Sequence, residues 1–242
     1  MKIGEDYDKI EFEMFGLDLL EPNALIGDFI LLLIAIYLGL KVNKLNSSMP
    51  FFRGWVLFFF TLGISLFLGG LGHCLFLYFG APGRYAGWLG SIISVMFLEH
   101  AIFSLYSNQE KAKRLKLLST IKMFLAIIAE IIIFSKLNLN EMQQRGLWVP
   151  MISSSIGFIY CLGFLANNYK KKITESFKFL EISLLFMIPA ALVQAMKISI
   201  YPWFDRNDIS HCFLVITLFM YWKAIEGYHN FLGQDLIYQN KK

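Results

Sequence analysis

Charged residues are scarce in this chain. They make up 17% of its 242 residues, whereas 57% are hydrophobic and 17% are aromatic. In soluble domains about a quarter of the residues are charged, so this composition excludes an ordinary soluble fold. Internal repeats, low-complexity tracts and long linkers are also lacking, which favours a single domain. The start, MKIGEDYDKIEFEMF, is acidic and has none of the basic-then-apolar pattern of a secretory signal, so we expect the first apolar segment to direct insertion itself.

Cysteines are few as well. Cys74, Cys161 and Cys212 all fall inside apolar segments, so a disulfide framework is not expected. The net charge of +4 is small, and the Lys and Arg residues concentrate in short loops between apolar segments, where membrane topology explains them. Nucleic acid is therefore not an expected partner, whereas membrane lipids are.

Seven segments of the chain are long and apolar enough to cross a bilayer. A spanning helix needs roughly 20 residues to cover about 30 Å of hydrocarbon. Lipid satisfies no backbone hydrogen bonds and the sequence shows no period-2 barrel pattern, so the sequence predicts an all-α bundle of seven transmembrane helices. The expected spans are residues 24–40, 55–79, 85–106, 117–135, 147–167, 177–200 and 209–227.

The loop charges predict the orientation of this bundle in a cell membrane. One side carries most of the basic residues, namely Lys41, Lys44, Arg53, Lys111, Lys113, Arg114, Lys116, Lys170, Lys171, Lys172, Lys241 and Lys242. By the positive-inside rule this side is cytoplasmic, which puts the N-terminus outside and the C-terminus inside. We expect an acidic extracytoplasmic segment over residues 1–22, the transmembrane domain over 23–232 and a cytoplasmic tail over 233–242.

Four ionisable residues from three distant spans then fall at one depth. The first span runs inward and has Asp28 near its outer end, while the second runs outward and carries His73 near its outer end. The seventh span runs inward and carries Asp208 and His211 in its first turn. Ionisable side chains facing lipid cost several kcal/mol, so we expect these four to face the bundle interior and to meet there.

Two histidines and two carboxylates in one pocket are typical of a metal site. Imidazole and carboxylate groups suit Zn²⁺, and three protein ligands with an open position allow a bound water to be activated. We predict His73, His211 and Asp208 as zinc ligands. Asp28 is a predicted catalytic residue that accepts a proton from the metal-bound water. The alternative stays open that the aspartates cap helices and the histidines are hydrogen-bonded core residues.

Two further polar groups lie inside spans. Glu130 stands in the outer half of the fourth span within AIIAEIIIF, where it needs a partner such as Lys197 or a histidine. It is the second candidate for the catalytic proton acceptor. Deeper in the bundle, we expect Glu99 to pair with Lys223, which in turn lies one helical turn before Glu226.

These residues carry a resemblance to a known superfamily. Seven helices with an outside N-terminus, TLGISLFLGGLGH ending at His73, NDISH ending at His211 and EPNALIGD at the first span resemble the alkaline ceramidases and the progestin/adiponectin-type receptors. The resemblance implies a zinc ion held by one histidine of the second span and two of the seventh, and hydrolysis of a lipid amide by the zinc-bound water. The sequence departs from this pattern at Asn207, where a third histidine is expected, and at Gly69, where a serine is expected.

The sequence thus leaves two functions open. The first is a zinc-dependent hydrolase of a lipid amide or ester, with its site near the outer face of a cell membrane. The second is a non-enzymatic seven-helix protein that binds lipid as a receptor or accessory subunit, in which the polar groups fix helix packing. The oligomeric state is undetermined by either.

Overall fold

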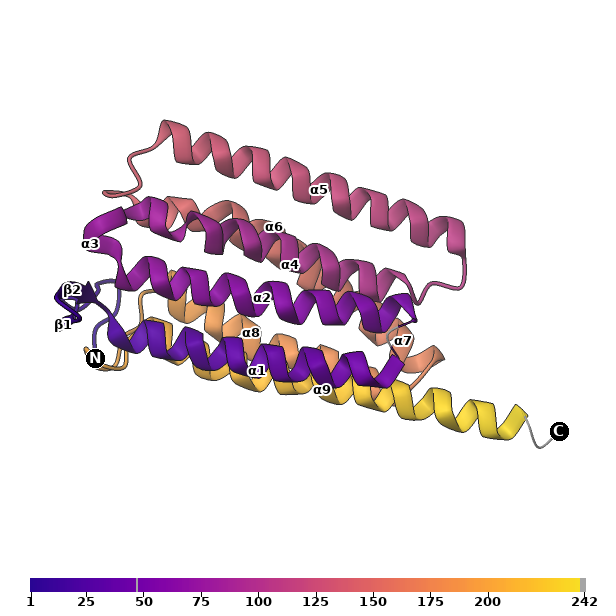
Figure 1. Cartoon of the computed structure of the whole chain (residues 1–242). Helices are drawn as coiled ribbons and strands as arrows, with labels where there is room; N and C mark the ends of the chain where they lie inside the picture. Colours follow the sequence, from indigo (N-terminus) through magenta and orange to yellow (C-terminus); the bar gives the residue numbers. More distant parts are fainter. Residues whose placement is uncertain (47, 240–242) are drawn as a thin grey trace.

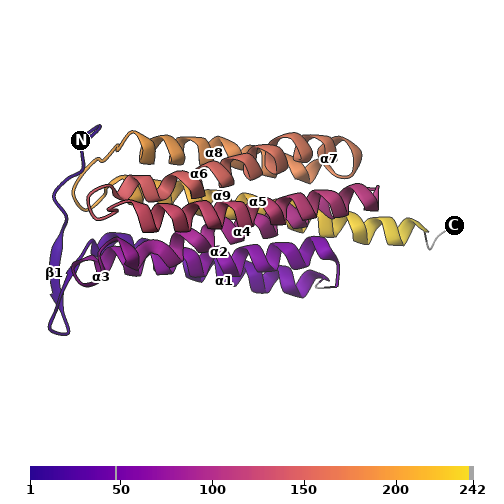
Figure 2. The same ribbon diagram turned by 90° about the horizontal axis from the view of Figure 1, so that it is seen from above.

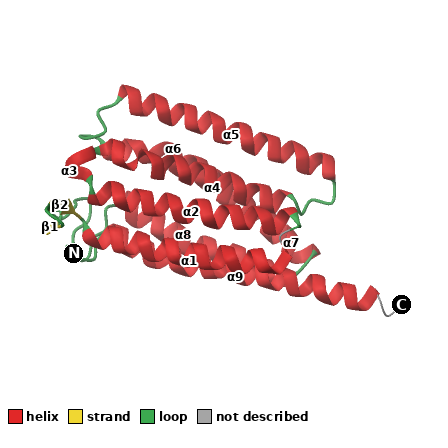
Figure 3. Cartoon of the chain, in the orientation of Figure 1, coloured by secondary structure: helices red, strands yellow, loops and turns green. Residues whose placement is uncertain are grey.

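Helices dominate the computed structural model, which describes residues 1–46 and 48–239, with side chains up to residue 234. Within these residues, seven helical stretches are long and apolar enough to cross a membrane, so the predicted all-α bundle of seven helices is confirmed (Figure 3). The stretches are α1 (Pro22–Asn46), α2 (Pro50–Cys74), η1 with α4 (Ala81–Arg84, Tyr85–Phe103), α5 (Gln109–Lys136), η2, α6, η3 and α7 (Gln143–Leu147, Trp148–Phe158, Ile159–Leu165, Ala166–Lys172), η4 with α8 (Glu175–Phe177, Lys178–Ala195) and α9 (Arg206–Gln239).

Several ends of these helices differ from the expected spans. The second span was expected to reach residue 79, but α2 ends at Cys74 and the short α3 (Phe76–Phe79) follows. The sixth was expected to reach residue 200, but α8 ends at Ala195, because Lys197 adopts a φ of +51° that no right-handed helix contains. The predicted tail over 233–242 begins inside α9, and residues 240–242 lie outside the described residues.

A β-hairpin, which the sequence analysis did not predict, precedes the bundle. Strands β1 (Glu11–Met14) and β2 (Leu17–Leu20) pair antiparallel around Phe15 and Gly16, which both have positive φ as a two-residue hairpin turn requires. The hairpin covers one end of the bundle, which we name the hairpin end (Figure 1). The last turns of α9 extend beyond the other end of the bundle, named here the opposite end.

The helices form a ring in which one element stands outside. α2 packs between α1 and α4, α9 packs between α1 and α8, and α8 and α4 both contact the stretch formed by α6 and η3. α5 packs on the outside of α4 and α6 (Figures 1 and 2). The interior of the ring is therefore lined by the other six spans.

Aromatic residues fill the opposite end of this ring. The start of α2 and the middle of α9 contribute five buried aromatic residues whose rings contact one another edge-on, stacked or tilted: Phe51, Phe52, Trp55, Tyr221 and Tyr228. Such pairs contribute roughly 0.5–1.5 kcal/mol beyond the area they bury. Because this cluster closes the opposite end, open space inside the ring lies toward the hairpin end.

Candidate binding cavity at the hairpin end

Glu21, directly before α1, connects three elements at the hairpin end. Its buried carboxylate accepts a hydrogen bond from Nδ1 of His73 at 2.8 Å and from Nζ of Lys9 at 3.0 Å. Nη2 of Arg84 lies 3.7 Å from the same oxygen. The backbone of Glu21 has a φ of +51°, which residues other than glycine rarely adopt, and such strain persists where the surroundings hold it. The network therefore fixes the turn from the hairpin into α1.

Asp28 and His211 meet inside the bundle, as the shared depth predicted. Oδ1 of Asp28 lies 3.2 Å from Nε2 of His211. Two glycines make room for the pair, because a Cβ at Gly70 would lie 2.8 Å from Oδ2 of Asp28 and one at Gly27 would lie 2.4 Å from Nδ1 of His211. The small residues here thus allow helices α1, α2 and α9 to approach closely around the Asp28–His211 contact.

Asp208 and its neighbour Asp205 organise the start of α9. Oδ2 of Asp208 accepts hydrogen bonds from Nδ2 of Asn23 at 2.7 Å and from the backbone N–H of Asp205 at 2.9 Å. Oδ1 of Asp205 accepts from the backbone N–H groups of Asn207 and Asp208 at 2.7 and 3.3 Å. Asp205 is therefore the cap of α9, while Asp208 ties the start of α9 to the start of α1.

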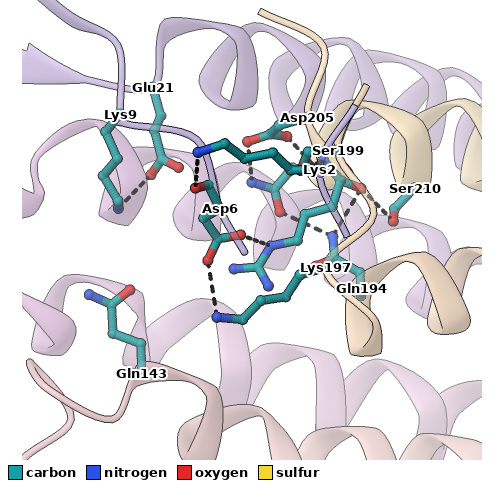
Figure 4. A network of polar contacts seen from close by, with 12 residues as sticks. Lys2, Asp6, Lys9, Glu21, Gln143, Gln194, Lys197, Ser199, Asp205 and Ser210 are labelled. Carbon is teal, nitrogen blue, oxygen red and sulfur yellow. Dashed lines mark hydrogen bonds and ion pairs between the residues drawn. The ribbon is translucent and has the colours of Figure 1, made fainter. Parts of the chain in front are cut away.

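The first residues of the chain, from Lys2 to Asp6, lie across the hairpin end, and we name this segment the strap. Asp6 forms ion pairs with Nζ of Lys197 at 3.3 Å and with Nε of Arg206 at 3.2 Å (Figure 4). The backbones of Lys2 and Ser199 exchange hydrogen bonds of 2.7 and 3.0 Å. The strap thus joins the N-terminus to the connection between α8 and α9.

Beneath this polar network lies a cavity of about 390 Å³ inside the ring. Its lining residues are Leu66, His73, Arg84, Trp88, Gln143, Gln144, Leu147, Met151, Met187, Ala190, Ala191, Gln194, Arg206, Asn207, Ser210, His211, Leu214 and Thr217. From His73 to Leu66 on α2 it extends about 10 Å toward the middle of the bundle. Met151 on α6 and Ala191 on α8 are exposed, so the cavity reaches the surface of the bundle between these two helices.

The cavity has one polar end and one apolar end. Two arginines and two histidines line it near the hairpin, and within the described residues no carboxylate does. A smaller pocket of about 70 Å³ above it is lined by the carboxylates of Asp6, Asp8, Glu21 and Asp205. His73, Arg84, Gln143, Arg206 and Asn207 line both spaces and thus separate them.

Arg84 is the most buried charged residue among those that separate the two spaces. Its side chain is 7% exposed, and Nη1 donates a hydrogen bond to Oε1 of Gln143 at 2.8 Å. Nε and Nη2 have no hydrogen-bond partner within the described residues. Neither Arg84 nor Glu21 is among the residues predicted from the sequence, because both stand at span ends, where a charge is expected as a topology signal.

The predicted catalytic residues take different places. Asp28 contacts His211, which lines the cavity. Glu130 on α5 is fully buried, its two carboxylate oxygens have no hydrogen-bond partner among the described side chains, and it lies outside the lining of the cavity. Its expected partner, Lys197, pairs with Asp6 instead.

The three predicted zinc ligands each have other partners. His73 bonds Glu21, His211 contacts Asp28, and Asp208 bonds Asn23 and the backbone of Asp205. Among the described residues, no group of three or more His, Cys, Asp or Glu side chains is placed to hold a metal ion. The side chains as they lie do not form the predicted ligand set, although His73 and His211 line the same cavity.

The network shifts the acidity of two carboxyls that lie between helices. Burial alone would raise the pKa of Glu21, but the hydrogen bond from His73 and the charges of His73 and Lys9 outweigh it, so the pKa lies below its ordinary value of 4.5. Burial raises the pKa of Asp205 to about 6, although the hydrogen bond from the backbone of Asn207 opposes this shift.

The lowered pKa of Glu21 predicts a pH-dependent contribution to stability. A carboxyl with a lowered pKa in the folded state stabilises the protein above its unfolded pKa, and this contribution is lost as the pH falls. We expect Glu21→Gln to lower the melting temperature clearly at about pH 7, and the difference from wild type to shrink as the pH falls below about 4.5. Glu13→Gln, which removes an exposed carboxylate of β1, is the control. A difference that stays constant down to about pH 3 would contradict the assignment.

The fold and the cavity define the class of the protein: a multi-pass α-helical membrane protein with a partly polar cavity at one end of its bundle. Over residues 24–230 the chain matches the family of unknown function DUF6962, and it belongs to that family. The match covers the helical bundle and leaves out the hairpin. No curated protein and no solved structure matches the chain. The resemblance to ceramidases and progestin/adiponectin-type receptors stays a prediction.

Proposed function

We propose that this protein binds a lipid or a similar amphiphile in the cavity at the hairpin end. The observation that carries the proposal is the cavity itself, which is about 390 Å³ in volume and falls within the range of small-molecule sites. Its walls change from Arg, His and Gln side chains to Leu, Met and Ala side chains along the bundle axis. A molecule with a polar head and an apolar chain matches both parts.

The opening of the cavity supports a ligand that comes from the membrane. The exposed side chains at its mouth, Met151 and Ala191, lie between α6 and α8, where a membrane-spanning bundle faces lipid. Seven apolar spans make this a membrane protein. We place it in the cell membrane with its hairpin end outside, as the loop charges predict.

Blocking the mouth of the cavity tests the proposal. We expect Ala191→Phe to weaken binding of a dye-labelled oleoyl lipid to the purified protein about tenfold or more, because the ring fills space that the chain needs. Leu192→Phe is the matched control, since Leu192 is exposed on the same helix and lies outside the lining of the cavity. Equal effects of the two variants, or no binding of the dye-labelled lipid to wild type, would reject the proposal.

A zinc-dependent hydrolysis of a lipid amide or ester is the second candidate. His73 and His211 line one cavity and each has a carboxylate partner on one ring nitrogen, an arrangement that also orients histidines in metal sites. It predicts stoichiometric zinc in protein purified without added metal, measured by mass spectrometry. It also predicts that His73→Ala and His211→Ala lose the zinc. Metal-free protein that still binds lipid would leave only the first function.

A further inference from the structure

We infer that the ligand of the cavity is an anionic amphiphile, whose phosphate or carboxylate head lies against Arg84 and Arg206. This inference rests on the proposed binding of an amphiphile and adds the chemistry of its head. It begins from the ionisable groups that line the cavity, which are two guanidinium groups and two imidazoles, with no carboxylate among the described lining residues. A cationic head has no partner of opposite charge there, and a neutral head would leave the guanidinium charges without a counter-ion.

Arg84 supplies donors that are otherwise unused. Water has little access to Arg84, because only 7% of its side chain is exposed. Its Nε and Nη2 atoms make no hydrogen bond within the described residues. A buried polar group without a partner costs about 1–3 kcal/mol, more for a charged group. Nε and Nη2 form the edge of the guanidinium that carboxylate and phosphate oxygens bind in parallel. Arg84 lines the cavity, and this bidentate edge is therefore buried there without a hydrogen-bond partner among the described residues.

Glu21 does not take this edge away. Its Oε2 is 3.7 Å from Nη2 of Arg84, beyond hydrogen-bond distance, and it accepts its hydrogen bonds from His73 and Lys9. The carboxylate reduces the local charge of Arg84 while leaving its donors open. The two donors of Arg84 thus stay unused, because Glu21 bonds its own partners.

Arg206 stands on the other side of the same polar end, at the start of α9. Its Nε contacts Asp6 of the strap at 3.2 Å, and its side chain, 21% exposed, lines both the acidic pocket and the cavity. A ligand head between the two arginines is therefore in competition with Asp6 for Arg206. Removal of the Asp6 carboxylate is expected to strengthen binding of an anionic head.

Three lipids that share an oleoyl chain separate the head from the chain. We expect oleoyl lysophosphatidic acid or oleate to displace the dye-labelled lipid from wild type at about tenfold lower concentration than neutral monoolein. Displacement by lysophosphatidic acid alone would identify a phosphate head, and displacement by both would identify any oxyanion head. Equal displacement by monoolein would overturn the inference and leave the proposed function intact. Failure of all three lipids would reject the proposed function itself.

Variants of the two arginines complete the test. Arg84→Gln should reduce the preference for the anionic lipids over monoolein about tenfold, while Arg145→Gln, an exposed arginine outside the lining of the cavity, should leave it unchanged. If Arg84→Gln fails to fold, Arg206→Gln and the opposite change, Asp6→Asn, decide the matter, with a weaker and a stronger preference expected. An unchanged preference in Arg206→Gln and Asp6→Asn would overturn the inference. If inorganic phosphate alone displaced the dye-labelled lipid at the same concentration, the ligand would be a free anion, and this result would also overturn the inference.

Discussion

Replacing Lys122 with methionine should destabilise the bundle by about 3–5 kcal/mol, because it leaves the Glu99 carboxylate buried without its partner. Nζ of Lys122 on α5 forms an ion pair with Glu99 on α4 and donates a hydrogen bond to the backbone carbonyl of Ser153 on α6 at 3.1 Å. The hydroxyl of Ser119 donates to the same carboxylate. This cluster joins α5, the helix outside the ring, to its two neighbours. Thermal unfolding in detergent micelles measures the effect.

Two controls separate the lost pair from the lost side chain. Lys113→Met, which replaces an exposed lysine of the same helix, should change the melting temperature little. The double variant Glu99→Gln, Lys122→Met should recover most of the stability, because removing both charges leaves none unpaired. A double variant as unstable as Lys122→Met alone would contradict the explanation.

Replacing Gly72 with alanine should cost about 1–3 kcal/mol through steric overlap of two backbones. A Cβ at this position would lie 2.4 Å from the carbonyl oxygen of Gly83 and 2.8 Å from the backbone nitrogen of Arg84. Neither atom belongs to a flexible side chain, so α2 and η1 would have to move apart. Because η1 positions Arg84 at the cavity, the variant should also weaken binding of the dye-labelled lipid.

Gly69, one turn earlier on α2, provides the matched control. A Cβ there would meet no atom within 4 Å, so Gly69→Ala should be neutral or stabilise the helix by up to about 1 kcal/mol. Melting temperatures of the two variants, measured side by side, test the contrast. Similar losses at both positions would mean that helix packing at Gly72 is looser than the structure has it.

The depth of each ionisable residue along its helix could be predicted from the sequence, whereas the partner of each residue in general could not. The expected meeting of Asp28 and His211 is confirmed by their contact, because each position follows from counting residues from the span ends. The expected pair of Glu99 and Lys223 is wrong, since Glu99 bonds Lys122 and Lys223 lies 3.4 Å from Glu226. Both lysines were available, and only the rotation of each helix about its axis decides which one faces Glu99.

Residues at the ends of spans were the ones most poorly predicted. Span boundaries put Glu21 and Arg84 outside the helices, although both are buried and both lie beside His73. The hairpin over residues 11–20 lies over this end of the bundle (Figure 1), and Lys9, just before it, bonds Glu21. A signal existed in the acid directly before the first span, but two of its three partners, His73 and Arg84, lie more than fifty residues away along the chain.

The sequence by itself determined the seven apolar helices and the level at which the ionisable residues lie, because hydropathy and helical rise are properties of each segment alone. Only the tertiary structure decided which of those groups are partners, where the ring leaves a cavity and which arginines line it. These features depend on helix rotation, on glycine contacts such as that of Gly72 with Gly83, and on the covering strap. Those contacts join distant segments, so no local pattern encodes them.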